Sequence, residues 1–208
     1  MRVDMIPRSR SGGFDAKERA VGIVFMIGLV VAAIYLVFLY NSLVGVKNAV
    51  SKAWANIDVL LKQRHDELPK LVDTCRQYMR HEQATLEKVI QARAQVAQAR
   101  EARDVNALGA AEGALRSGLG NLFAVAESYP DLKANEQFAH LQSRISGLEN
   151  AIADRREFYN ESVNINNVSI EQFPENIVAR WFAFKPFELL RFEAAELKDV
   201  DIGQAFSR

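Results

Sequence analysis

Residues 20–40 read AVGIVFMIGLVVAAIYLVFLY, and no Asp, Glu, Lys, Arg or His occurs from Ala20 to Val46. A helix of that length covers about 30 Å, which is the thickness of the hydrocarbon layer of a bilayer. A cleavable signal peptide has a shorter apolar stretch followed by a small-residue cleavage site, whereas here Ala32-Ala33 leads directly into IYLVFLY. We therefore expect an uncleaved, single-pass transmembrane helix over residues 20–40.

The charges on the two sides of this span predict its orientation. The tail before it, residues 1–19, holds five basic residues, whereas the first 18 residues after Tyr40 hold two. Because basic residues are retained on the cytoplasmic side, the N-terminus is expected in the cytoplasm and the rest of the chain outside the inner (cytoplasmic) membrane, in the periplasm. Serine and glycine make the tail a flexible segment.

Beyond the span, the sequence has the pattern of long amphipathic helices. Apolar residues recur at spacings of three and four, and glycine is absent between Gly45 and Gly109. Four stretches of about 26, 33, 25 and 36 residues carry such stripes. The third stretch ends at Tyr129-Pro130, since a residue before proline leaves the helical region, and Asn135 is a suitable N-cap for the fourth. The fourth stripe consists of Phe138, Leu141, Ile145, Leu148, Ile152, Tyr159 and Val163.

Pro69 decides how the first two stretches are connected, because the apolar register continues through it and no glycine or asparagine offers a tight turn. A continuous, kinked helix is one solution. A helix of about 60 residues would extend roughly 90 Å, however, and the two later helices could not cover both of its halves. We therefore expect a hinge at Pro69 and an all-α fold, in which the transmembrane helix is followed by an antiparallel four-helix bundle over residues 41–172. The alternative is an elongated, kinked helical hairpin that completes its packing by oligomerising.

The remaining segment, residues 173–208, is rich in aromatic residues. It holds six of the twelve phenylalanines, together with Trp181. Aromatic side chains at this density require burial, and three sites could provide it: the open end of the bundle, another subunit or partner, and the membrane surface. The candidate interaction residues are Phe173, Trp181, Phe182, Phe184, Phe187 and Phe192. Gly28 and Ala32 form a small-xxx-small pair that is expected to pack transmembrane helices together.

The asparagines of the fourth predicted helix have a structural interpretation. Five asparagines lie near Tyr159, where buried amides need hydrogen-bond partners; some are expected to fix the register of helix contacts, and others could bond to a partner protein. Trp54 and Asp58, one turn apart, are expected to face this cluster, with Asp58 accepting from an asparagine or arginine. The asparagines are Asn150, Asn160, Asn164, Asn166 and Asn167.

The glycines around Gly118 follow no predicted strand and are not part of a GK[ST] motif. They therefore predict close helix packing or a self-association surface and not a phosphate-binding loop.

The residues offer little for catalysis. The formal net charge is zero, which gives no general attraction to nucleic acid, and Cys75 is the single cysteine. His65 and His81 are 16 residues apart and point to different faces of a helix, so they do not form a metal pair. His81-Glu82 begins like a zinc-protease motif, but Thr85 occupies the position of the second histidine. We expect no catalytic, metal-binding or cofactor-binding residues.

Three strings resemble the bacterial LemA family, in order and over about 150 residues: YNSLVGVKNAVSKAWANIDVLLKQRHDELPKLVDT (40–74), AVAESYPDLKANEQFAHLQ (124–142) and ENAIADRREFYNESVNINNVSIEQFPENIVARWFAFKP (149–186). The chain departs from the family pattern at Asn166, where tyrosine is common, at Glu67-Leu68 and at Ala183. The resemblance implies a single-span helical-bundle membrane protein without an assigned catalytic activity. Family genes often lie near those of membrane-bound zinc metallopeptidases, which implies a scaffolding or envelope role.

These observations predict a non-enzymatic scaffold of the bacterial cell envelope, held in the lipid bilayer. It is expected to form homo-oligomers through its helical bundle and its C-terminal aromatic segment. The alternative is an adaptor or regulator of a membrane-bound protease or another envelope protein, and an unrecognised hydrolase is a third hypothesis.

Overall fold

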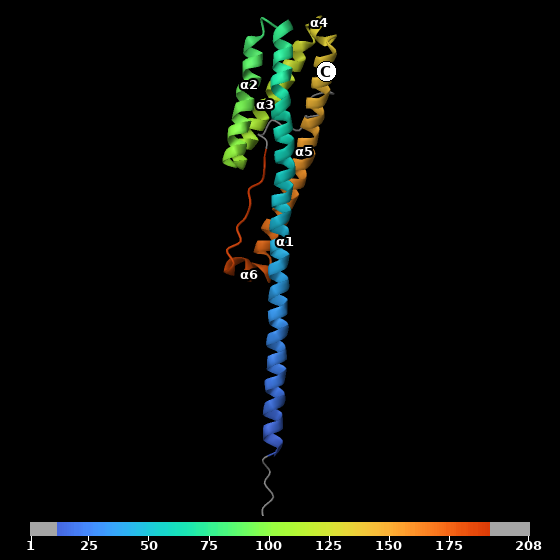
Figure 1. The fold of residues 1–208 in the computed structure, drawn as a ribbon. Coiled ribbons are helices and arrows are strands. Elements are labelled where there is room, and N and C mark those ends of the chain that lie inside the picture. Colours follow the sequence, from blue (N-terminus) through green and yellow to red (C-terminus); the bar gives the residue numbers. More distant parts are fainter. Residues whose placement is uncertain (1–11, 192–208) are drawn as a thin grey trace, which may run out of the picture.

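The computed structural model describes residues 12–191, which form six helices and no strand. In chain order these are α1 (Gly12–Tyr78), α2 (Gln83–Ala102), α3 (Val105–Ala126), α4 (Pro130–Lys133), α5 (Glu136–Glu171) and α6 (Glu175–Trp181). The predicted all-α fold is confirmed. Figure 1 shows a long rod: α1 runs its full length, and the other helices gather along its upper half.

From Ala20 to Phe38, α1 carries no charged residue, and most of this stretch stands apart from the other helices (Figure 1). Every large apolar side chain from Val21 to Phe38 is at least 42% exposed to its surroundings. The described residues contain one helix that is long and apolar enough to cross a bilayer, and this is it. The stretch fits a membrane anchor, as its composition predicted.

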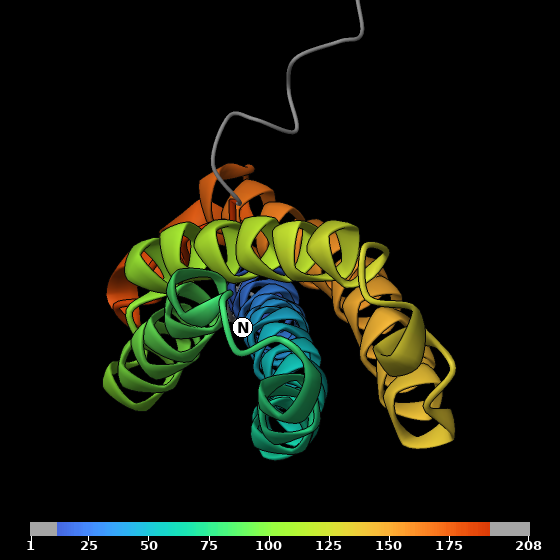
Figure 2. The same ribbon diagram turned by 90° about the horizontal axis from the view of Figure 1, so that it is seen from above.

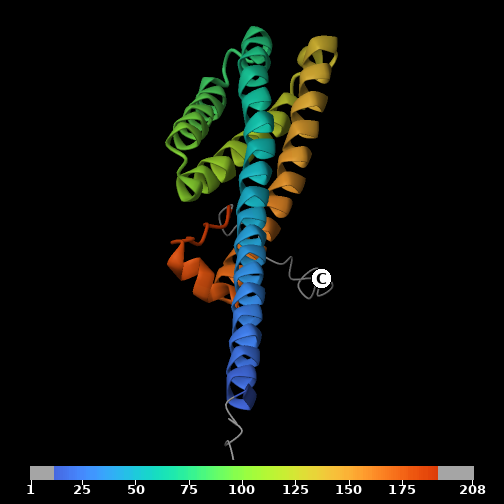
Figure 3. The same ribbon diagram turned by 60° about the horizontal axis from the view of Figure 1, so that its bottom comes forward.

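Above this stretch, α1 pairs with α5 and α2 pairs with α3. Figure 2 shows α3 lying across the assembly between α2 and α5, and Figure 3 shows it crossing α1 obliquely. The regular antiparallel four-helix bundle that we expected is not what these pairings form. The predicted stripes nevertheless build the core, since every member of the α5 stripe is buried. On α1 the buried side chains include Val50, Ile57, Leu61, Leu68, Leu71 and Cys75.

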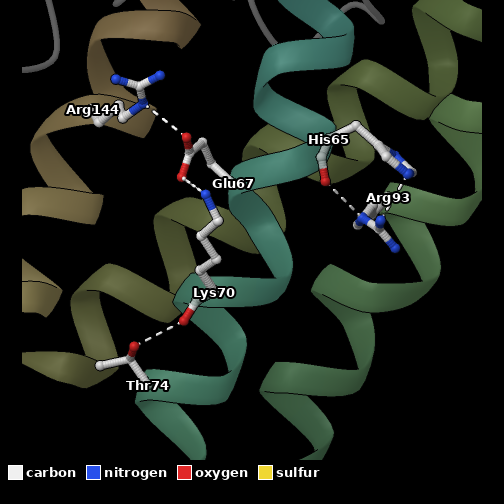
Figure 4. Close-up of polar contacts among 6 residues, drawn as sticks. All are labelled: His65, Glu67, Lys70, Thr74, Arg93 and Arg144. Carbon is white, nitrogen blue, oxygen red and sulfur yellow. Dashed lines mark hydrogen bonds and ion pairs between the residues drawn. The ribbon is translucent and has the colours of Figure 1, made fainter.

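The hinge expected at Pro69 is wrong, because α1 continues through this residue to Tyr78. A proline lacks the N–H that would bond to the carbonyl four residues earlier, which here belongs to His65. Arg93 of α2 supplies the missing donor: its Nε lies 3.1 Å from the His65 carbonyl oxygen (Figure 4). The helix therefore keeps its direction because a side chain from a neighbouring helix satisfies the carbonyl that Pro69 leaves unpaired.

The same arginine also holds the His65 ring, with Nη2 of Arg93 2.7 Å from Nε2 of His65. Arginine has no acceptor, so the ring nitrogen accepts and the imidazole is neutral. Burial and the positive charge of Arg93 both lower the pKa of His65, which favours that neutral form. On the other side of α1, Glu67 contacts Lys70 at 3.1 Å and Arg144 of α5 at 3.0 Å (Figure 4), which links α1 to α5.

The chain reverses instead at residues 79–82, between α1 and α2. The part of α1 beyond residue 40 is consequently about 57 Å long, at 1.5 Å per residue, and α5 can cover most of it.

The N-termini of α3 and α5 are capped by side chains of the expected types. Asp104 caps α3 by accepting from the Ala107 N–H, and Asn135 caps α5 by accepting from the Phe138 N–H, as predicted.

Candidate functional site

Three of the candidate aromatic residues, Trp181, Phe182 and Phe184, lie at or next to the end of α6, beside the last residues of the apolar stretch of α1. α6 packs on α1 through Val178 and Ala179, which are buried against Leu39 and Leu43. It therefore lies beside the last residues of the apolar stretch (Figure 1). A short helix in this position brings the C-terminal aromatics to the level at which α1 changes from apolar to amphipathic.

An aromatic cluster forms at this junction around Tyr40. The ring centroids of Tyr40 and Phe182 are 4.7 Å apart, and those of Tyr40 and Phe184 are 6.0 Å apart. Lys47 Nζ lies 5.9 Å from the centroid of Phe184, within the range of a cation–π contact. An apolar hollow of about 230 Å³ beside this cluster is lined by Leu36, Val37, Tyr40, Val178, Trp181 and Phe182.

The predicted interaction residues divide into two groups. Trp181, Phe173 and Phe182 are 76%, 75% and 58% exposed. Phe184 and Phe187 are half-buried: Phe184 packs against the cluster around Leu39, and Phe187 packs against the main core. Phe192 lies outside the described residues. The exposed group is the part of the segment that remains available to a partner or to lipid.

After α6 the chain runs back along the helices in an extended form, and we call residues 182–191 the C-terminal strap. Two asparagines of α5 hold its backbone. The Asn167 amide donates to the Phe187 carbonyl at 2.9 Å and accepts from the Phe187 N–H at 3.0 Å. The Asn160 amide likewise donates to the Leu190 carbonyl at 3.1 Å and accepts from the Leu190 N–H at 2.8 Å. Because the two asparagines are seven residues apart, they project from one face of α5.

The asparagine cluster therefore has a different role from the one expected, since two of its members bind the strap. Tyr159 adds to this by donating from its hydroxyl to the Glu188 carbonyl at 3.0 Å, and burial raises the pKa of that hydroxyl. Asn166 is buried and donates to Asn167 Oδ1 at 3.2 Å. Asn150 and Asn164 are exposed. The backbone of the strap is thus bound by side-chain amides at Phe187 and at Leu190.

The contacts expected for Trp54 and Asp58 are present in part. Trp54 stacks edge-on against Tyr159, with ring centroids 5.6 Å apart. Asp58 accepts from Arg100 of α2 at 2.9 Å and does not contact the asparagines in any hydrogen bond or ion pair that the described residues show. Trp54 thus supports the tyrosine that holds the strap, and Asp58 joins α1 to α2.

Two glycines of α3 lie in close packing positions. A Cβ atom at Gly109 would stand 1.9 Å from the carbonyl oxygen of Arg191, so the strap passes directly over this residue. A Cβ atom at Gly118 would meet Val89 of α2 at 3.5 Å, which is ordinary contact, whereas a Cβ atom at Gly120 would meet nothing within 4 Å. Gly109 therefore serves internal packing, because the strap leaves no room there for a side chain.

A buried ionic group was not predicted from the sequence. Arg64 of α1 is 1% exposed and bonds to Glu112 of α3 through Nη2 and to Glu149 of α5 through Nη1. Burial opposes the charge of Arg64, but the two carboxylates outweigh this effect and raise its pKa. Burial raises the pKa of Glu112, although Arg64 counteracts it. The three side chains join the three helices that cross at this point.

The reactive residue types are dispersed. His65 is held by Arg93, His81 is exposed in the turn after α1, and His140 is exposed on α5. Within the described part of the chain, no three His, Cys, Asp or Glu side chains gather in a way that could hold a metal ion. Cys75 is fully buried on α1, and burial raises the pKa of its thiol to about 12.

Cys75 is expected to report the opening of the helical core. Its thiol should react with Ellman's reagent at pH 8 only as fast as the fold opens, because a thiol that is buried and neutral is not a nucleophile. The folded pKa of about 12 exceeds the unfolded value, so rising alkaline pH deprotonates the unfolded chain first and lowers stability. The exposed variant Gln77→Cys, in a Cys75→Ala background, is the control and should react at once. Immediate reaction of native Cys75 would contradict its burial.

Comparison with known proteins gives related sequences. The model of the LemA family matches residues 53–203. The chain is 32% identical to Magnetosome protein MamQ 2 of Paramagnetospirillum magneticum over 100 residues, which are 48% of this chain and 37% of that protein. MamQ of Magnetospirillum gryphiswaldense is 30% identical over the same share of both chains. The chain thus spans little more than a third of the length of these magnetosome proteins.

A further relative is aligned over most of its length. Protein LemA of Metamycoplasma hominis is 29% identical over 192 residues, which are 89% of this chain and 83% of that protein. The family match extends from the middle of α1 into the C-terminal segment, and it includes the helices that carry the buried ionic group and the asparagines that hold the strap. The chain therefore belongs to the LemA family.

Proposed function

We propose that this protein is a membrane-anchored, non-enzymatic scaffold whose copies associate side by side in the cell envelope. The anchor is the apolar stretch of α1 from Val21 to Phe38, whose large apolar side chains are at least 42% exposed in the described structure and are covered by lipid in a bilayer. The excess of basic residues before the span supports a cytoplasmic N-terminus and a helical domain on the outer side of the inner membrane.

An exposed apolar stripe on α5 carries this proposal. Phe158, Ile165 and Val168 are each about half exposed, although they lie on a helix whose opposite face is buried against α1. Their spacings of seven and three place them along one side of α5. Such a row on an otherwise charged surface is typical of a protein contact.

A second copy of the same chain is the occupant that fits this stripe. Two copies with the same anchor stand parallel in one bilayer, so each presents its α5 stripe at the same height. A contact between identical stripes about a twofold axis along the membrane normal is then possible without any change of shape. The aromatic residues Phe184 and Phe187 are less suitable for such a contact, because they already pack against their own chain.

Cross-linking in native membranes tests this arrangement. Ile165→Cys in a Cys75→Ala background is expected to give a dimer with a short bis-maleimide, because the stripes face each other. Gln91→Cys, an exposed position on α2, is the matched control and should remain monomeric. Dimers at both positions, or at neither, would contradict an interface on α5.

The particle mass provides an independent measurement. After gentle solubilisation the particle is expected to contain two or more chains of 23.3 kDa each, and Ile165→Glu should reduce it to the monomer. A second protein in stoichiometric amount that is lost with the same substitution would favour the adaptor function instead. A native particle of one chain would exclude the scaffold as proposed.

A further inference from the structure

The outer face of α6 is apolar although its inner face is already used for packing. Val178 and Ala179 are buried on α1, while Ile177 and Trp181, one turn apart, are exposed on the other side together with Phe182. Arg180 and Lys185 flank these side chains and are also exposed. Tryptophan and phenylalanine among basic residues are the side chains that favour the interface between lipid and water.

The height of this face is determined by α1. Because α1 is one continuous helix, positions along it translate directly into distances along the rod. Trp181 and Phe182 line the same hollow as Leu36 and Val37, and Phe182 stacks on Tyr40. Leu36 and Val37 lie about 4.5–6 Å before the end of the apolar run at Tyr40. The exposed face of α6 is therefore level with the last turn of the span.

Any bilayer that surrounds residues 20–40 must consequently reach α6. The hollow beside it is lined almost entirely by apolar atoms, from both α1 and α6. The first charged residue beyond the span is Lys47, about 10 Å further along α1 than Tyr40, and it lies near Phe184 at the upper side of the cluster. The order of apolar, aromatic and basic side chains along the rod matches the order of layers in a bilayer surface.

We infer that α6 is a lipid-docking helix, whose side chains Ile177, Trp181 and Phe182 enter the interface of the bilayer that holds the span of their own chain. The protein then contacts the membrane with two elements, one crossing it and one lying on it. This inference rests on the proposed membrane anchor, and it is independent of self-association through α5.

The two tryptophans of the chain allow a direct test. Trp54→Phe leaves Trp181 as the single fluorophore, and Trp181→Phe leaves Trp54, which lies about 21 Å beyond Tyr40 along α1. Each full-length variant is reconstituted into phosphatidylcholine vesicles with or without bromine atoms on the acyl chains near the headgroup. We expect brominated lipid to reduce Trp181 emission at least twofold and to leave Trp54 emission unchanged.

Three results would overturn the inference. Trp181 emission that is unaffected by bromine but fully quenched by aqueous acrylamide would place α6 in water. Quenching by bromine that disappears as the protein-to-lipid ratio increases would show that a second copy covers Trp181. Equal quenching of Trp54 and Trp181 would show that the signal does not depend on depth.

A separate measurement distinguishes failure of this inference from failure of the anchor. Chain that is released from the vesicles by alkaline carbonate would disprove the transmembrane helix, and with it the lipid contact of α6. Chain that is retained while Trp181 fails to respond to bromine would disprove the α6 contact alone. Trp181→Glu, with unchanged helicity and unchanged Trp54 emission, is expected to remain anchored and supplies a folded variant without the lipid contact.

Discussion

Replacing Arg64 by alanine is expected to lower the free energy of unfolding by about 3–5 kcal/mol, the range for a buried ion pair that loses one partner. Arg64 is 1% exposed and Glu112 is 3% exposed, so removal of the guanidinium leaves a carboxylate without a counterion in the interior. Glu149 is 17% exposed and can reach water, so Glu112 accounts for most of the effect. Urea unfolding of the full-length chain in mild detergent, followed by Trp54 fluorescence in a Trp181→Phe background, measures the loss.

Two further variants make the cause of this loss measurable. Lys62→Ala, two residues away on the exposed side of α1, is the matched control and should change stability by less than about 0.5 kcal/mol. The double variant Arg64→Met, Glu112→Leu should recover most of the loss, because it leaves no unpaired charge in the core. A double variant as unstable as Arg64→Ala would show that packing around Arg64, and not the orphaned charge of Glu112, is responsible.

Gly109→Ala is expected to displace the C-terminal strap at a cost of about 1–3 kcal/mol, the usual range for an overpacked site. A Cβ atom here would stand 1.9 Å from the Arg191 carbonyl oxygen, and the backbone at Leu190 cannot move aside without losing its two bonds to Asn160. Limited proteolysis of the full-length protein should cut the strap faster in this variant. The same variant should expose Tyr159, whose hydroxyl bonds to the strap.

Gly120→Ala on the same helix is the matched control, since its Cβ atom would meet nothing within 4 Å. Alanine is the better helix former, so this variant should gain up to about 1 kcal/mol and keep the strap in place. Opposite signs for the two substitutions would separate steric exclusion from helix propensity. A stabilised Gly109→Ala variant with an intact strap would contradict the close approach of Arg191.

The helical stripes and caps were predictable because they depend on local spacing. Every apolar residue of the predicted α5 stripe is buried, and Asn135 caps that helix as expected. The apolar span was equally clear, since the run from Ala20 to Tyr40 has the length and composition that fit a membrane-spanning helix. These features depend on residues within a few turns of one another, where helix geometry alone relates sequence to position.

The connection at Pro69 was not predictable by the same means. Proline disfavours the helix interior through the carbonyl that it leaves unpaired, and that cost is removed here by Arg93, which is 28 residues from His65 in the sequence. The reversal at residues 79–82 contains neither glycine nor proline. The continuation of α1 through Pro69 thus depended on Arg93 of α2, and the sequence did not reveal where α2 lies relative to α1.

The candidate site was also predictable only in part from the sequence. An aromatic density that requires burial was evident from the sequence, but the division into half-buried Phe187 and exposed Trp181 depends on the path of the strap. Arg64 and Glu112 are 48 residues apart and look like members of solvated helix faces. Their pairing results from the oblique crossing of α3 over α1, which no repeat or motif indicates.

The unbroken course of α1 also has a mechanical consequence. A helix without a joint at the membrane surface behaves as a lever, so any tilt of the span in the bilayer is passed in full to the outer end. With about 57 Å of helix beyond residue 40, an ordinary tilt of about 20° would move that end sideways by roughly 20 Å. Since tilt depends on bilayer thickness, the reach of the protein would vary with the lipid composition around its anchor.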